Sequence, residues 1–141
     1  MTILESIRNF IYTYPPLADG WIRVDYLGAA PGEYSIDAVP AAQVLTQYVN
    51  GDSERQCEFV FTSCEAYGPE VVQNLENNGF YEDFAAWLGE QTRKGNLPAM
   101  SGGKTAERIE ALSSGYLYRS GTDSAQYQIQ CRLIYHQKGE M

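Results

Sequence analysis

The chain has 141 residues, 44% of them hydrophobic and 20% charged, which is enough to bury the core of one globular domain without disulfides. Its ten basic and eighteen acidic residues give a net charge of −8, which argues against nucleic acid or an anionic membrane surface as the main partner. Three cysteines without CxxC spacing predict a reducing compartment. We therefore expect a single domain over residues 1–141, located in the cytoplasm, that binds neither membrane nor a specific nucleic-acid sequence.

The first predicted element is an amphipathic helix. Its apolar residues recur with the 3.6-residue period of one helix face: Ile3, Leu4, Ile7, Phe10, Ile11 and Tyr14. Thr2 and Glu5 have the spacing of a capping box, which favours a helix start at this point. Pro15-Pro16 then ends the helix, because proline cannot continue the hydrogen-bond ladder.

A run of strands follows the first helix. Alternating apolar and polar residues predict strands over residues 21–27, 34–39, 43–49 and 55–63, and Pro40 ends the second of them. Gly28 to Gly32 and Asn50 to Ser53 are turn-rich breaks between these strands. The last two strands flank an Asn-Gly turn, so we expect them to form a hairpin.

The second half of the chain predicts one helical region and two strands. Helical spacing begins at Pro69, is interrupted at Asn77–Gly79, and ends at Lys94-Gly95. A strand is predicted over 106–118, with Ser113–Gly115 as a bulge, followed by a turn at 120–123 and the clearest alternation of the chain at 124–136. The order α-β-β-β-β-α-β-β predicts an α+β fold with a mostly antiparallel sheet flanked by two helical regions.

Catalytic signatures are weak throughout the sequence. Ser101–Thr105 reads SGGKT, but a phosphate-binding P-loop requires glycine where Pro98 stands, so we interpret this segment as a loop. The single histidine, His136, lies near the chain end on the polar face of a strand and is predicted to be exposed. Cys57 and Cys131 fall within apolar alternations typical of core positions. We predict no catalytic, metal-binding or cofactor-binding residue, and not an enzyme.

Four stretches together resemble a known family. They are MTILESIRNFI at residues 1–11, ENNGFYEDFAAWL at 76–88, KTAERIEALSSGYL at 104–117 and YQIQCRLIY at 127–135. This pattern resembles small phage and prophage minor capsid proteins of the tail terminator family, over nearly the whole chain. The resemblance implies a small α+β fold and a structural role in which a ring, usually of six subunits, caps the tail tube and presents a surface to the head connector.

The resemblance also implies partners and contact surfaces. The expected partners are further copies of the chain, the tail tube protein and a head–tail connector protein, first in the host cytoplasm and then in the virion. Loops are the expected places of contact, with the following candidate residues: Gly28, Pro31, Gly51, Asp52, Gly103, Lys104, Gly121 and Asp123. Two alternatives stay open, namely another connector or minor capsid protein, and a small ligand-binding domain or enzyme of unknown substrate.

Overall fold

The computed structural model describes residues 2–15, 21–24, 33–66, 71–120 and 124–139. Two helices and seven strands follow one another in these ranges: α1 (Ile3–Ile11), β1 (Trp21–Val24), β2 (Glu33–Ala38), β3 (Val44–Gln47), β4 (Ser53–Ala66), α2 (Val71–Lys94), β5 (Lys104–Ala111), β6 (Tyr116–Ser120) and β7 (Ser124–Gln137). Consecutive strands and two helices confirm the predicted α+β class.

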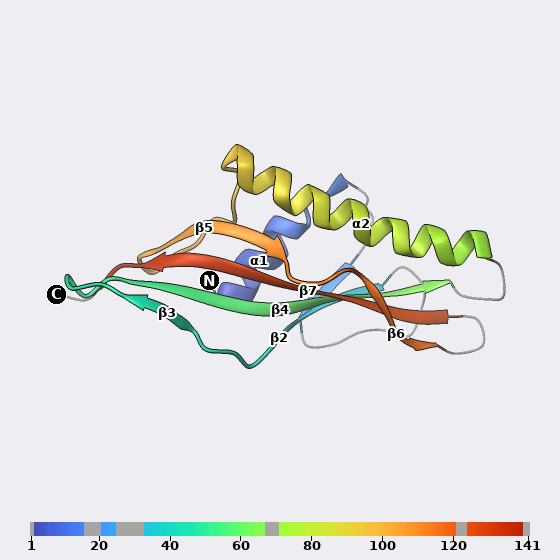
Figure 1. The fold of residues 1–141 in the computed structure, drawn as a ribbon, viewed down its shortest axis with the longest axis horizontal. Helices are drawn as coiled ribbons and strands as arrows, with labels where there is room; N and C mark the ends of the chain where they lie inside the picture. The colour runs from blue at the N-terminus through green and yellow to red at the C-terminus, as the bar shows by residue number, and fades with distance from the viewer. Residues whose placement is uncertain (1, 16–20, 25–32, 67–70, 121–123, 140–141) are drawn as a thin grey trace.

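One twisted sheet contains all seven strands, and its centre is the pair of long strands β4 and β7 (Figure 1). β4 and β7 pair antiparallel over their full 14 residues. β2 and β3 share the other edge of β4, and β5 and β6 share the other edge of β7. β1 extends the sheet beyond β2 and forms its one parallel pair among the described strands. The predicted hairpin is confirmed as β3 and β4.

Two details of the prediction were wrong. Residues 106–118 form two strands in place of one, and the irregularity between them at 112–115 includes the predicted bulge at Ser113–Gly115. The N–H groups of Leu112 and Ser113 still donate to the carbonyl of Gln130 in β7 at this irregularity. Gly115 packs so closely on α2 at this point that a Cβ atom would lie 2.4 Å from Cβ of Tyr81. The helix is not interrupted at residues 77–79 either. Gly79 costs helix propensity of about 1 kcal/mol, which a 24-residue helix tolerates.

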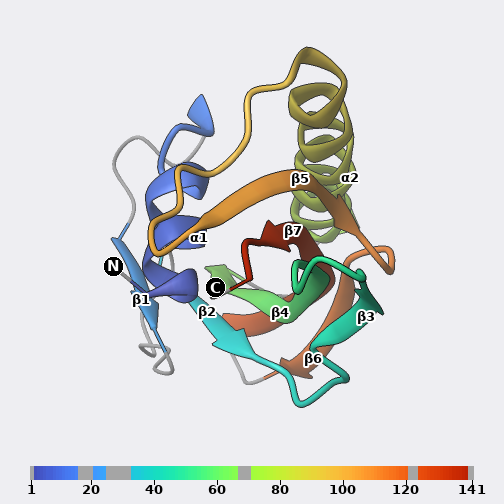
Figure 2. The same cartoon turned by 90° about the vertical axis from the view of Figure 1, so that its left-hand side faces the viewer.

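Both helices pack on the same face of the sheet (Figure 2). Their contact is largely aromatic. The Phe10 ring of α1 lies 5.1 Å from the Trp87 ring, and the Tyr14 ring lies 5.4 Å from the Phe84 ring of α2. The predicted alternation in β7 is confirmed, since every second side chain from Ala125 to Tyr135 is buried in this core. The helix-covered face therefore excludes water in its middle, whereas the end of the sheet at the left of Figure 1 extends beyond both helices.

Candidate functional site

Four of the eight predicted contact residues lie together at one end of the sheet. Gly51 and Asp52 are in the β3–β4 turn, and Gly103 and Lys104 are at the start of β5. Both segments meet residues 136–139 at the end of β7, at the left of Figure 1. The other four candidates, Gly28, Pro31, Gly121 and Asp123, lie outside the described residues. We call residues 48–53, 101–104 and 136–139 the hairpin end.

Backbone register brings these distant segments together. Ser53 pairs with Gln137, and Gln137 pairs with Lys104, so the three residues form one row across β4, β7 and β5. The N–H of Lys138 donates to the carbonyl of Gly103 at 2.8 Å, and Nε2 of Gln137 donates to the carbonyl of Gly102 at 3.1 Å. Because one ladder joins all three segments, their side chains have fixed positions relative to one another.

The carboxylate of Asp52 ties the turn to the end of the chain. One oxygen accepts a hydrogen bond from the N–H of Gly139 at 2.8 Å, and the other lies 2.8 Å from Nε2 of His136. The Gly139 hydrogen bond first, and then the His136 ring, hold the pKa of the Asp52 carboxyl below its ordinary value. The packing is tight, since a Cβ atom on Gly139 would lie 2.5 Å from the carbonyl carbon of Gly51.

The predicted exposure of His136 is confirmed only in part, because the ring also contacts other residues. Its side chain is 36% exposed, it bonds to Asp52, and its ring stacks on Tyr48 with 6.0 Å between the ring centroids. The sequence placed it near a chain end, but β7 continues to Gln137 and pairs with β4 on one side and β5 on the other. His136 therefore holds the β3–β4 turn on the sheet, a role that spacing along the chain does not reveal.

Cations gather in a cavity at the same end. The cavity has a volume of about 360 Å³ and a mainly polar lining that includes Arg55, Lys104 and Lys138, together with Gly51, Ser53, Gly102, Gln137 and Gly139. The Nε of Arg55 donates to the hydroxyl of Ser53 at 2.9 Å, which orients the guanidinium group. Of these three cations, only Lys104 was predicted from the sequence as a contact residue. No short motif joins three residues that lie so far apart in the chain.

Apolar side chains are exposed on the strand beside this cavity. All four residues of β3 are exposed, and the large apolar groups of this region are Val44, Leu45, Tyr48 and Val49, which we call the β3 surface. β3 pairs with β4 along one edge, and no strand in the described part of the chain pairs with its other edge. An exposed edge strand with apolar side chains can add a strand or an apolar surface from another chain.

Side-chain hydroxyls cover part of the outer edges of β1 and β5, where a further strand could pair, whereas the outer edge of β3 has no such cover among the described residues. The hydroxyl of Tyr12, the residue after α1, contacts both the N–H and the carbonyl of Ile22 in β1, at 3.0 and 3.3 Å. In the same way, Oγ1 of Thr92 in α2 contacts the N–H and the carbonyl of Ile109 in β5, at 3.1 and 2.8 Å. Each hydroxyl uses the two backbone groups with which another strand would pair.

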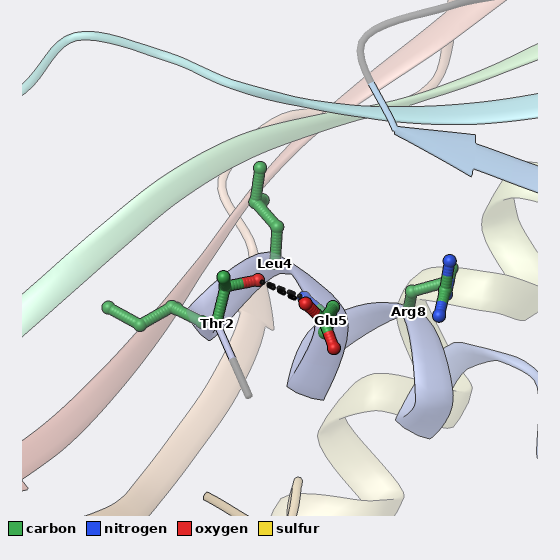
Figure 3. Close-up of a pocket in the computed structure, with 5 residues that line it drawn as sticks. Thr2, Leu4, Glu5 and Arg8 are labelled. Atoms are coloured by element: carbon green, nitrogen blue, oxygen red, sulfur yellow. Dashed lines mark hydrogen bonds between the residues drawn. The ribbon is translucent and has the colours of Figure 1, made fainter. Parts of the chain in front are cut away.

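A second depression lies at the start of α1 (Figure 3). It has a volume of about 570 Å³ and is lined by Thr2, Ile3, Leu4, Glu5 and Arg8. The N–H of Glu5 donates to Oγ1 of Thr2 at 3.1 Å, which confirms Thr2 as the helix cap. Because its central hydrogen bonds belong to the cap and its lining is mostly apolar, we assign no ligand to this depression.

The remaining reactive groups do not form a centre in the described residues. Burial raises the pKa of the Cys57 and Cys131 thiols, which keeps both protonated at neutral pH. No group of three or more His, Cys, Asp or Glu side chains is placed to hold a metal ion in the described ranges. β5 begins directly at Lys104, so the SGGKT segment opens a strand and not the helix of a P-loop.

Comparisons with known proteins add no relative. No protein-family model matches the chain, and no curated protein is similar to it. Among the helices of the described residues, none is both long and apolar enough to cross a membrane. Function is therefore inferred from the hairpin end and the β3 surface.

Proposed function

We propose that this chain is a structural virion-assembly protein that caps a phage tail tube as a ring and joins it to the head connector. Three features support this proposal: the sequence resemblance to tail terminators, the α+β fold, and the β3 surface. The β3 surface is the observation on which the proposal depends most. It exposes apolar groups beside the hairpin end, where four of the predicted contact residues gather.

A ring requires each subunit to use one surface repeatedly in the same way. The β3 surface meets this requirement, because Leu45 is 41% exposed and Tyr48 is 42% exposed, beside a strand edge free of other described strands. Full burial of an exposed leucine stabilises by roughly 1.5–3 kcal/mol, so burying the exposed part of Leu45 at an interface contributes roughly 1 kcal/mol. Since the contact recurs at every subunit boundary, a change in one residue acts on every boundary of the ring.

The test uses the purified protein with and without tail tubes. We expect the native chain to form rings, either alone or on tube ends, in electron micrographs and in light scattering. Leu45→Asp is expected to abolish the rings, because a carboxylate would be buried at each boundary. The matched control is Leu112→Asp, which adds the same charge at an equally exposed leucine in the β5–β6 connection. Rings from Leu45→Asp, or equal loss in both variants, would refute the role of the β3 surface.

A role as another head–tail connector would use the same surface and differ in its place in the virion. The two roles have different consequences for particles that lack the protein. Loss of a terminator leaves tubes of uncontrolled length, whereas loss of another connector leaves tubes of normal length that are not joined to heads.

A further inference from the structure

Three cations converge on the cavity at the hairpin end from separate parts of the chain. Arg55 comes from β4, Lys104 from the first residue of β5, and Lys138 from the residue after β7. Arg55 and Ser53 lie on one face of β4, because they are two residues apart, and Ser53 is in register with Gln137 and Lys104. The sheet therefore directs Arg55 and Lys104 to the same side.

These three cations line one cavity without a carboxylate partner, unlike several other cations in the described part of the chain. Lys94 pairs with Glu90 at 2.8 Å, and Arg108 and Arg132 pair with Glu110 at 2.7 and 3.0 Å. Arg55, Lys104 and Lys138 have no ion pair with any residue that the structure describes. In a chain of net charge −8, three neighbouring cations without carboxylates repel one another, and an anion from outside would remove that repulsion.

The carboxylate beside the cavity is already engaged. Asp52 precedes Ser53, but its two oxygens bond to the N–H of Gly139 and to the His136 ring. Glycines make up much of the remaining wall, and Gly51 and Gly102 adopt φ angles of 95° and 72°, which favour residues without a side chain. The volume of about 360 Å³ is thus left open to a group larger than a simple halide ion.

We propose that this cationic pocket is a binding site for a multiply charged oxyanion, either a free phosphate-type ion or the carboxylates of an acidic polypeptide. The two sources share the same chemistry, namely several oxygens with negative charge. The Arg55 guanidinium offers a planar fork to two of these oxygens, and the two lysines add point charges. Bound there, the anion links the β3–β4 turn to β5 and the chain end. The proposal does not require the ring function.

Titration calorimetry with two probes tests the site: pyrophosphate, and an oligoglutamate peptide. We expect at least one probe to bind, with an affinity that falls as salt rises. Lys104→Gln and Arg55→Gln should each weaken binding by roughly tenfold or more, since each removes a charge-assisted contact. Arg55→Lys should lie between the native chain and Arg55→Gln, because it keeps the charge but loses the fork.

Lys94→Gln is the matched control, since it removes a lysine from an exposed helix position away from the pocket, and it should bind like the native chain. Thermal melts of every variant identify any that fail to fold. Binding of pyrophosphate alone identifies a free oxyanion as the ligand, and binding of the peptide alone identifies an acidic polypeptide. If neither probe binds, or if folded Lys104→Gln and Arg55→Gln variants bind as tightly as the native chain, the proposal is overturned.

Discussion

Thr92→Val is expected to destabilise the fold by removing the protection of the β5 edge. The Thr92 hydroxyl bonds to the N–H and the carbonyl of Ile109, at 3.1 and 2.8 Å. Each hydrogen bond stabilises by about 0.5–1.5 kcal/mol net, so the loss is about 1–3 kcal/mol. With about 2.1 cal/mol/K of unfolding entropy per residue and 141 residues, Tm should fall by about 3–10 °C in a calorimetric melt.

The choice of valine isolates the hydroxyl. Valine and threonine have nearly the same shape and similar helix propensity, so the difference reports the two hydrogen bonds with the backbone of Ile109. Thr92→Ser keeps the hydroxyl and loses only a methyl group, and it should cost clearly less than Thr92→Val. If the two variants melted at the same temperature, the hydroxyl would not protect the edge.

Three further predictions concern the hairpin end and the core. Gly139→Ala should lower Tm, because its Cβ would lie 2.5 Å from the backbone of Gly51. Gly79→Ala, whose Cβ would have no atom within 4 Å, should raise Tm, because it increases the free energy of unfolding by about 0.5–1 kcal/mol. The contacts of the Asp52 carboxylate lower its pKa in the folded chain, so they stabilise the fold at pH values above the ordinary pKa of 3.8. This stabilisation is lost as the pH falls through the pKa that Asp52 has in the folded chain. Asp52→Asn should therefore melt below the native chain near neutral pH, and this deficit should shrink in acid; a deficit independent of pH contradicts the assignment. Tyr81→Phe removes the buried hydroxyl that bonds to Ser63 and to a β7 carbonyl, and it should cost about 1–3 kcal/mol in denaturant unfolding.

Local signals in the sequence predicted most of the elements. The Thr2 cap, the stop at Lys94-Gly95 and the alternation before His136 each depend on neighbours within a few residues, and the structure confirms each of them. The hairpin of β3 and β4 is equally local. The division of residues 106–118 was predicted only as a bulge at Ser113–Gly115, because both halves look like strand and their separate pairing with two parts of β7 appears only in the fold.

The sequence predicted only part of the candidate site, because the pairing register of the strands decides which residues meet there. Gly51, Asp52, Gly103 and Lys104 were chosen as loop residues, and the sheet brings them together. Their meeting depends on the pairing of β4, β7 and β5, which adds residues such as Arg55 that no loop signal marks. The bond between His136 and Asp52 joins positions far apart in sequence, so it too appears only with the fold.

The proposed role in tail assembly is tested most directly by electron microscopy of particles from a producing strain that lacks this gene. A ring that caps the tube stops its growth, so the account predicts over-long tubes and tails without heads, both restored to normal by the native gene but not by a gene carrying Leu45→Asp. Tails of normal length joined to heads, with normal infectivity, would contradict the proposed function.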